Sequence, residues 1–518
     1  MSLERLNRHQ RPIAKRILVR GTLILDTPTC LGSGDADSPT DLALLRDSIS
    51  DHALLTGSSI AGALRNYLRE YEHGYGTSEQ EFDCASVLFG GIRRVDDGEQ
   101  SPLIVNDAIS SKIPTVELRD GVEIEGTTGT AKKGQKYDLE LLAAGTEFLL
   151  CFELLIEQKQ DPREQQNYED RLAKSLALAL RGLELGEIGM GMKKRRGFGR
   201  CHVKEWQVWN FNLEDAGDRN LWLNFEHWRT GFIPIFNVHT SITEALGIQL
   251  DINGEDKRDH FILHATFQLV GSLLIRSGQD STGRAPDVVH LKSHRSGKTD
   301  AEPVLSGTSL AGVLRHRAER IVNTLHEVNQ HITQEIVNDI FGFVSDKKAS
   351  KQPEANEAKK KPDAKASRLV VHETVIKEAT DLVQNRIAID RFTGGAYHGA
   401  LFDEQPIFGG NDTRVTIELE LRKPEEYEIG LLLLLLKDLW TSDLPVGGES
   451  SIGRGRLKGT YAKMTCYESG KSQEWVIHQQ CDNSLRISHP EKLGDFVKAL
   501  VDYSASISNA GSDKKTAA

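Results

Sequence analysis

The chain has 518 residues, and its 64 Lys and Arg against 75 Asp and Glu give a formal net charge of −11. A single hydrophobic core does not grow to this length, so we expect about three domains or fewer. A composition of 38 % hydrophobic and 27 % charged residues excludes a disordered chain. The longest apolar run, Leu431–Leu436, is far shorter than the ~20 residues of a membrane-spanning helix, so we expect no membrane partner. The acidic balance disfavours bulk nucleic-acid binding but allows a local basic groove.

The cysteine spacing excludes a zinc ribbon and a Cys-x-x-Cys redox centre. Isolated cysteines in a long chain are typical of a reducing compartment, and we expect a cytoplasmic protein. The six cysteines are Cys30, Cys84, Cys151, Cys201, Cys466 and Cys481.

An internal duplication organises the chain. The segment LTGSSIAGALR at 55–65 returns as LSGTSLAGVLR at 305–315, an offset of 250 residues. Three further landmarks recur in the same order, and the slowly growing offset is what loop insertions between two copies of one domain would produce. These pairs are 88–90 with 340–342, 136–140 with 401–404, and 197–200 with 453–456.

The sequence pattern of each copy predicts strands and helices in the same order. Alternating apolar and polar residues at 17–25 and 261–269 predict half-buried strands. Gly-Ser-Ser at 57–59 and Gly-Thr-Ser at 307–309 offer helix N-caps before residues of helical period. Second helices are expected at 168–185 and 427–440, each followed by a glycine-rich turn and a strand. We therefore expect an α+β protein of two tandem ferredoxin-like (RRM-like, βαββαβ) domains.

Composition gives provisional boundaries for these units. They are a first domain at 1–209, an ordered connector at 210–259 that packs between the halves, a second domain at 260–465, a strand and helix extension at 466–503, and a disordered tail at 504–518. The Lys-, Ala- and Pro-rich tract 346–367 predicts a mobile surface insertion.

A glycine-rich basic loop is the first candidate for chemistry. Between a predicted helix and strand, residues 189–200 read GMGMKKRRGFGR, and the second copy keeps the turn at 447–458 with fewer charges. Glycines let backbone amides approach an anion while the cations neutralise it. A solvated basic turn is the alternative, but recurrence in both copies favours a phosphate-binding loop. The cations are Lys193, Lys194, Arg195, Arg196 and Arg200, with Arg454 and Arg456 in the second copy.

Two loop aspartates are the second candidate. Asp41 and Asp287 each precede apolar residues and a cation five positions on. On residue type alone such aspartates favour Asx-turns and caps. The functional alternative is a carboxylate that holds a divalent cation beside a phosphodiester. Arg65 and Arg315 end the first predicted helices, where a cation either suits the helix dipole or contacts RNA. No histidine is spaced to form a catalytic pair.

Long excursions between the central strands form the third feature. They span about 106–140 and 373–404, and each reads as a strand, a Thr-Gly turn and a returning strand. A surface hairpin is the simplest interpretation, although long paired excursions are often functional.

Taken together, these features resemble the RAMP superfamily, and specifically the backbone subunits of type III CRISPR effector complexes. The resemblance rests on the G-x-S-x-x-G-x-L-R stretches at 57–65 and 307–315, the two glycine-rich loops, the aspartate loops, and the thumb-like segments 119–131 and 386–396. It covers roughly 17–209 and 260–465. Two such domains in one chain look like a fused double-backbone subunit, as in type III-D variants.

The resemblance implies a CRISPR guide-RNA-binding subunit that cleaves complementary single-stranded target RNA at fixed intervals. Asp41 and Asp287 would then be catalytic and would hold Mg²⁺ or Mn²⁺. The loop cations above, with Arg386 and Arg391 of the second thumb and Arg65 and Arg315, would contact RNA. Implied partners are other RAMP backbone subunits and the large and small subunits of a prokaryotic type III complex.

Two alternatives remain open at this point. One is a guide-binding scaffold with one or both sites inert, since Ser293 stands where the first copy has Asp47 and the second loop is less basic. The other is a metal-independent endonuclease that processes guide precursors. The duplication, and the scarcity of histidines at the glycine-rich loops, argue against the latter.

Overall fold

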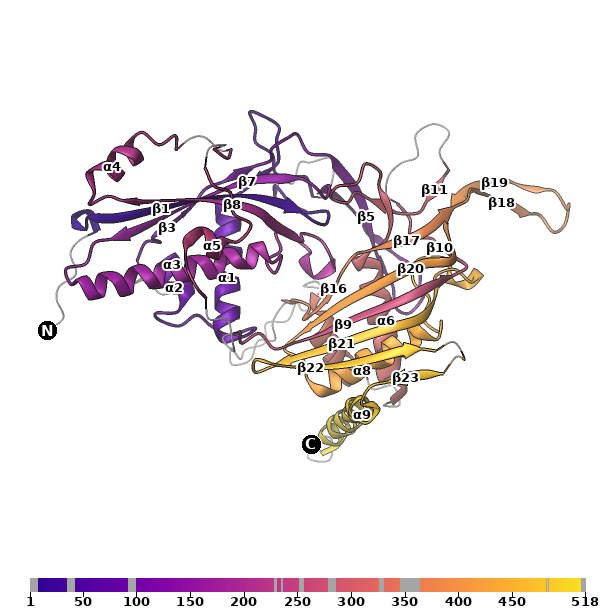
Figure 1. Ribbon diagram of the computed structural model, residues 1–518. Coiled ribbons are helices and arrows are strands. Elements are labelled where there is room, and N and C mark those ends of the chain that lie inside the picture. Colours follow the sequence, from indigo (N-terminus) through magenta and orange to yellow (C-terminus); the bar gives the residue numbers. More distant parts are fainter. Residues whose placement is uncertain are drawn as a thin grey trace, which may run out of the picture.

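The computed structural model shows two α+β halves joined by a connector (Figure 1). It describes residues 8–34, 42–91, 99–227, 231–233, 236–250, 256–277, 286–325, 330–344, 364–480, 482 and 484–513. Most of the predicted insertion, residues 346–363, lies outside this range. None of the helices within it is long and apolar enough to cross a membrane.

The first half is an antiparallel sheet of order β3-β7-β1-β8, with helices packed on one face. Its strands are β1 (Ile13–Leu25), β3 (Leu103–Val105), β7 (Glu147–Glu157) and β8 (Cys201–Asn212). Its helices are α1 (Gly57–His73), α2 (Cys84–Phe89) and α3 (Pro162–Glu184). Apolar side chains of these helices and of the inner sheet face form one core.

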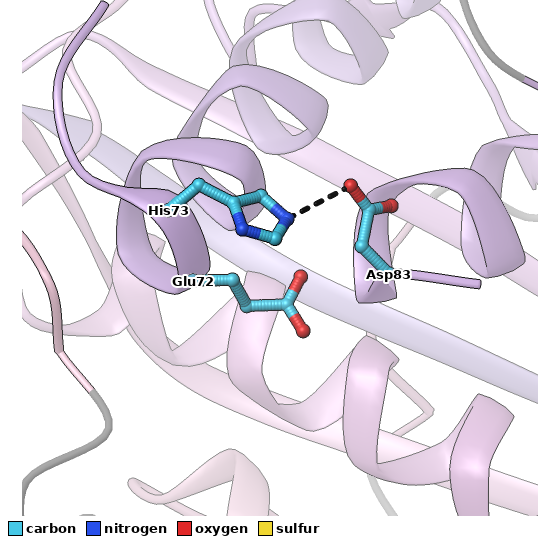
Figure 2. Close-up of side chains that lie close together, drawn as sticks. All are labelled: Glu72, His73 and Asp83. Carbon is cyan, nitrogen blue, oxygen red and sulfur yellow. Dashed lines mark hydrogen bonds and ion pairs between the residues drawn. The ribbon is translucent and has the colours of Figure 1, made fainter. Parts of the chain in front are cut away.

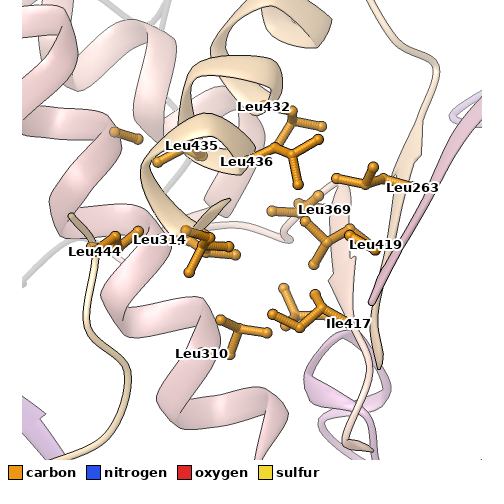
Figure 3. Close-up of a cluster of buried hydrophobic side chains, with 14 of the residues drawn as sticks. Leu263, Leu310, Leu314, Leu369, Ile417, Leu419, Leu432, Leu435, Leu436 and Leu444 are labelled. Carbon is orange, nitrogen blue, oxygen red and sulfur yellow. The ribbon is translucent and has the colours of Figure 1, made fainter. Parts of the chain in front are cut away.

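The second half repeats this arrangement, with strand order β16-β20-β9-β21 at the centre of a larger sheet. The four strands are β9 (His260–Val270), β16 (Leu369–Val371), β20 (Ile407–Arg422) and β21 (Arg456–Glu468), and the helices are α6 (Gly307–Leu325), α7 (Gln330–Phe341), α8 (Glu426–Trp440) and α9 (Pro490–Asp513). Leucines of α6 and α8 interlock with the inner face of the sheet in a second, separate core (Figure 3).

Additional strands complete the two halves. The first half adds β2 (Leu54–Leu55) and β4 (Ala108–Ile109), which pair with each other. The second adds β10 (Ser272–Leu273), β11 (Val288–Val289), β12 (Lys292–Ser293), β13 (Glu302–Leu305), β14 (Phe343–Val344), β15 (Ala364–Lys365), β17 (Thr374–Asp381), β22 (Lys471–Gln479) and β23 (Leu485–Ile487).

The first helices begin at Gly57 and Gly307, and their capping residues lie one position before the segments that the sequence offered as caps. Thr56 is the N-cap of α1, where its side chain accepts a hydrogen bond from the Ser59 amide. Ser306 accepts the equivalent bond from the Ser309 amide at the start of α6. An N-cap hydroxyl satisfies an amide that has no partner within the helix, so both copies start this helix by the same device.

Both long excursions contain an antiparallel hairpin. The first pairs β5 (Val116–Ile124) with β6 (Ala131–Leu142), and the second pairs β18 (Gln384–Ile389) with β19 (Ala396–Gln405). Each tip contains the Thr-Gly turn seen in the sequence. Gly129 and Gly394 have φ of 68° and 69°, a left-handed conformation that glycine adopts without strain.

Most of the described connector packs on the first half, which corrects the expectation that it packs between the halves; its last residue, Asp259, accepts from the Lys423 and Ser469 amides of the second half. Trp222 and Phe225 lie with Trp209 and Phe211 on the outer face of the first sheet. Beneath them the buried Arg20 donates to the carbonyls of Glu226 and Gly231. This cover explains why β1 is buried on both faces while β9 alternates as predicted. The connector contains α4 (Ala216–Leu223) and α5 (Ile242–Leu246).

Several predicted boundaries also differ from the structure. Strand β8 crosses the boundary at 209, and β21 crosses that at 465. The C-terminal extension belongs to the second core, because Trp475, Phe496 and Leu500 are buried in it. The tail predicted to be disordered from residue 504 is helical to Asp513 as the end of α9. Ala364 and Lys365 form β15, and Ser367 is buried. Residues 364–367 are therefore not part of a mobile insertion.

Candidate nucleic-acid interface

The two glycine-rich loops have the same backbone construction. In the first, the Met190 amide donates to the Gly199 carbonyl, and in the second the Val446 amide donates to that of Gly455, each at 2.8 Å. Each loop holds one short 3₁₀ turn, η2 (Lys194–Arg196) and η4 (Ser450–Ile452). Left-handed residues flank both turns, namely Lys193 and Gly197 in the first loop, and Glu449 and Gly453 in the second.

The cations of the first loop have few acidic partners. The Lys193 ammonium lies 3.8 Å from the ring centroid of Tyr137, a cation–π contact. Lys194 is exposed, and its Nζ donates to the Gly189 carbonyl. Arg195 is half-buried and has no hydrogen bond or ion pair with any described residue. Burial and the neighbouring Arg422 lower the pKa of Arg195. A bound anion would stabilise the charged form of this guanidinium.

Arg196 and Arg200 face the second half of the chain. One terminal nitrogen of Arg196 donates to the Phe341 carbonyl at 3.2 Å, and the other is buried with no partner among the described residues. Burial and the nearby Arg315 lower the pKa of Arg196. The Arg200 guanidinium forms an exposed ion pair with Glu418 at 3.2 Å. These two residues therefore belong to the joint between the halves.

The second loop has fewer cations than the first, and Lys458 and Arg456 are its exposed ones. Arg456 is exposed and has no ion pair with the described residues. Arg454, predicted to bind RNA, is instead buried and ion-paired with Glu404 at 2.9 Å and Glu449 at 2.8 Å. Arg386 also pairs with Glu404, at 2.7 Å. Arg391 is exposed at the tip of the β18–β19 hairpin.

Arg65 and Arg315 have a structural role that the sequence left open. Arg65 pairs with Glu79 at 2.7 Å and donates to the Gly91 carbonyl. Arg315 donates to the carbonyl of Gly342, the first residue after α7, and Gly91 is the second residue after α2. Both guanidiniums thus bind the chain after the second helix, which explains the repeated arginine without RNA.

The two aspartate loops are in register with each other. Asp41 lies outside the described residues, but its neighbour Leu42 forms a parallel bridge with Leu139 of β6. Val288, which follows Asp287, forms the equivalent parallel bridge with Glu404 of β19. Asp287 is exposed beside the base of the second hairpin, and its Oδ2 accepts from the Asp403 amide at 3.0 Å.

The support beneath these aspartates differs between the halves. In the first, Leu139 packs against Phe198 in a small apolar cluster with Cys30 and Leu141. Their counterparts in the second half are Glu404 and Arg454, a buried ion pair. Sequence reasoning noted both motifs but missed this exchange of a hydrophobic pair for an ionic one.

A second acid completes the ion-pair network. Glu449 contacts Arg454 and, more distantly, Arg386. Although burial opposes its ionisation, Glu404 has a pKa below its ordinary value because it bonds Glu449 and Arg454. Burial and the same bond to Glu404 raise the pKa of Glu449. The network therefore holds the base of the second hairpin against the glycine-rich loop.

A separate buried network joins the two halves. Arg119 of the first hairpin donates to Glu373 of the second half at 2.9 Å and to Glu117 at 3.0 Å. Arg295 donates to Glu373 at 2.8 Å, while Glu117 accepts from the His294 amide at 2.7 Å. These partners are up to 254 residues apart, so no sequence spacing could have indicated them.

One group of close ligand-type side chains occurs among the described residues, and it is a helix cap. Glu72 and His73 end α1 and face Asp83 (Figure 2). Asp83 is the N-cap of α2 and accepts from the Ser86 amide, and Glu72 accepts from the Cys84 amide. Asp287 is not part of this group. Hydrogen bonds at the end of α1 and the start of α2 account for the close approach of Glu72, His73 and Asp83.

The comparison with protein families agrees with this duplicated architecture. The family model of the RAMP superfamily matches residues 22–202 and 266–458, which together are most of the chain. The chain belongs to the RAMP superfamily. No curated protein matches it. Each RAMP region covers most of one core, and each contains one hairpin and one glycine-rich loop.

Proposed function

We propose that this protein is a guide-RNA-binding backbone subunit of a type III CRISPR effector complex, with one site for target-RNA cleavage in each half. The observation that carries the proposal is the repeated geometry of each RAMP half. In both, an aspartate loop bridges the base of a hairpin, and that base packs on a glycine-rich loop.

Each half is, on this proposal, a ferredoxin-like domain with its hairpin as a thumb. The strand orders β3-β7-β1-β8 and β16-β20-β9-β21, antiparallel throughout, support the domain assignment. The hairpins support the thumb assignment because their tips carry exposed side chains, including Arg391 and Phe392. Such tips are suited to insertion between bases, which stack on aromatic and guanidinium groups.

The first loop provides most of the phosphate contacts. Lys193, Lys194 and Arg195 lie together at its surface with few acidic partners, and Arg456 is the corresponding open cation of the second half. Neutralising phosphates releases condensed counterions, which makes this binding strong at low salt. Arg386, Arg454, Arg65 and Arg315 are engaged within the fold and are not part of the proposed surface.

Asp287 and Asp41 are the proposed catalytic carboxylates. One Asp287 oxygen accepts from the Asp403 amide, which orients the carboxylate. A single exposed carboxylate fits Mg²⁺ or Mn²⁺, because such ions take one or two carboxylates with water and substrate phosphate oxygens. A bound cation would stabilise the charge that develops on the phosphodiester. The carboxylate orients the 2′-hydroxyl of an unstacked nucleotide toward the adjacent phosphate.

The test uses the guide-loaded assembly and an end-labelled complementary RNA, with and without Mg²⁺. We expect Asp41→Asn/Asp287→Asn to abolish cutting while target binding is retained, because asparagine keeps the shape and removes the charge. Asp300→Asn, at an exposed loop residue of the second half, is the matched control. Cutting that persists in the double variant would identify a scaffold. Metal-independent cutting of guide precursors would identify the processing enzyme instead.

A further inference from the structure

The sheet of the second half continues past its RAMP region. Strands β22 and β23 add to the edge of β21, and both lie beyond residue 458, where the family match ends (Figure 1). In the first half, β8 is the last strand of its sheet among the described residues. Trp475 and Ile477 of β22 pack on the second core, so the alternate side chains of β22 lie on the outer face. The extension therefore widens the outer face of the second sheet only.

This outer face is open in the second half and covered in the first. On the first sheet, Trp222 and Phe225 of the connector pack over β8. On β21, Ala462 and Met464 belong to the second core, whereas Tyr461 is 38 % exposed. The same side of the sheet is thus a buried apolar contact in one half and a solvent-exposed surface in the other.

An aromatic and cationic row crosses the outer face of the extension. Tyr461 of β21 pairs with His478 of β22, which in turn pairs with Arg486 of β23. Side chains of residues paired directly across a sheet lie on one face, about 5 Å apart. The rings of Tyr461 and His478 meet edge to face, with centroids 6.3 Å apart. His478 and Arg486 are exposed, and Arg486 has no ion pair with any described residue.

A hollow lies beside this row. It has a volume of ≈ 710 Å³, and its lining includes His478, Gln480, Arg486 and Ser488. This volume is within the range of about 300–1,000 Å³ that is typical of ligand pockets. The Ser488 hydroxyl accepts from the Val476 amide, which fixes it at the wall of the hollow. The hollow therefore offers polar groups beside a ring and a guanidinium.

The charge of this surface favours an anionic occupant. No acidic side chain is among the described residues that line the hollow. Lys458, farther along the outer face of β21, is exposed and has no ion pair with the described residues. Unpaired bases stack on aromatic rings and guanidinium groups, while nearby cations neutralise their phosphates. A row of tyrosine, histidine and arginine at strand spacing therefore fits a single strand of RNA.

We propose that the outer face of β21–β23 is a second RNA site, which binds an unpaired strand by stacking its bases on Tyr461 and His478. Arg486 neutralises a phosphate of that strand, and the hollow accepts one base. The site lies outside both hairpins and outside the cations of the first glycine-rich loop. The inference therefore goes beyond the proposed function, since it requires neither a guide in the loops nor cleavage.

Photo-cross-linking of the full-length protein locates the site. The probe is an oligouridine of about eight nucleotides that carries 5-iodouridine, a length within the range that one single-strand site covers. Mass spectrometry of the cross-linked peptides should recover Tyr461 or His478. The same RNA annealed to its complement should not compete, because its bases are no longer free to stack. Cross-links confined to the glycine-rich loops and hairpins would overturn the proposal.

Fluorescence anisotropy with the same oligouridine measures what the row contributes. The parent is the full-length chain with Lys194→Gln/Arg195→Gln, which removes the main contacts proposed for the first loop. In this parent, Tyr461→Leu/His478→Leu should weaken binding about tenfold, because two stacking surfaces are lost. Tyr461→Phe/His478→Phe keeps both rings and should bind as the parent does, which separates stacking from a defect in folding.

Tyr467→Leu is the matched control. Tyr467 also lies on β21 and is 39 % exposed, but its ring is already stacked on His260 at a centroid distance of 4.5 Å. Its replacement should leave the affinity unchanged.

Two results of the binding series would overturn the inference. If Tyr461→Leu/His478→Leu has no effect, and Lys194→Gln/Arg195→Gln alone abolishes binding, all RNA contacts belong to the first loop. The proposed function would then stand without a second site. If free UMP competes as well as the oligouridine at the same nucleotide concentration, the hollow is a mononucleotide pocket and the extended row binds no strand.

Discussion

The two halves of this molecule share a backbone plan and differ in what stabilises it. Leu139 against Phe198 in the first half corresponds to Glu404 against Arg454 in the second. An apolar pair is stabilised by burial alone, whereas a buried ion pair must offset the desolvation of both charges. One hairpin position can therefore be held by either kind of contact. The two proposed sites, however, should respond differently to substitution and to pH.

The largest effect is expected where the ionic support is broken. Arg454→Met should lower the free energy of unfolding of the second half by about 3–5 kcal/mol, because it leaves Glu404 buried beside Arg386 alone. Glu404→Leu/Arg454→Phe, which copies the first half, should recover most of that loss. Urea denaturation of Glu404→Leu, Arg454→Phe and the double variant, beside Arg454→Met, checks this. Additive losses would show that the two positions are not a coupled pair.

The joint between the halves should be next in sensitivity. Arg119→Met leaves Glu117 and Glu373 without their shared guanidinium, which should cost about 3 kcal/mol. Calorimetry should then resolve separate transitions for the two halves where the wild type unfolds more cooperatively. Lys132→Met is the control, since its ion pair with Glu123 is exposed and should be worth under about 1 kcal/mol. An unchanged single transition in Arg119→Met would mean that other contacts couple the halves.

RNA binding should depend more on the first loop than on the second. Lys194→Gln/Arg195→Gln should reduce the slope of log K against log salt by about 1.4, and Arg456→Gln by about 0.7, at roughly 0.7 per phosphate contact on a single strand. Fluorescence anisotropy with labelled guide RNA over a KCl series measures both slopes. Arg391→Gln, measured in the same way, shows whether the tip of the β18–β19 hairpin contributes to RNA binding. If the variants of the two loops reduced the slope equally, the prediction that the first loop makes more phosphate contacts than the second would be contradicted.

A smaller effect is expected from the exposed side of the joint. Burial opposes ionisation of Glu418, but His264, His372 and Arg200 lower its pKa to about 2. Its ionised form therefore adds stability above its ordinary pKa of about 4.3, and this contribution is lost as the pH falls toward 2. Glu418→Gln should flatten the stability curve in that window, so that it lowers stability most at neutral pH, where the lost contribution is fully present, and least near pH 2. Glu474→Gln, whose ion pair with Lys463 is exposed, should leave the curve as it is.

The sequence predicted what local patterns determine. The repeated LxGxSxAGxLR segment predicted both first helices, and the Thr-Gly pairs predicted the turns of both excursions, because caps and left-handed turns depend on a few adjacent residues. The family resemblance followed from these motifs in order, and the RAMP match agrees with it.

What the sequence did not predict depends on long-range packing. Phe198 and Arg454 occupy equivalent positions and are both buried, and only the partner at the hairpin base, Leu139 or Glu404, decides whether the buried contact is apolar or ionic. Trp222 and Phe225 could have covered either half, and the choice rests on contacts with β1 and β8. Local spacing carries no information on such contacts.

Mapping the cuts in target RNA at single-nucleotide resolution tests the central claim, that each half holds one cleavage site, most directly. The guide-loaded assembly would be compared as wild type, Asp41→Asn and Asp287→Asn under the same Mg²⁺ concentration. We predict that each variant loses one cut and keeps the other at its original position. A variant that removes both cuts, or both variants retaining every cut, would contradict one independent site in each half.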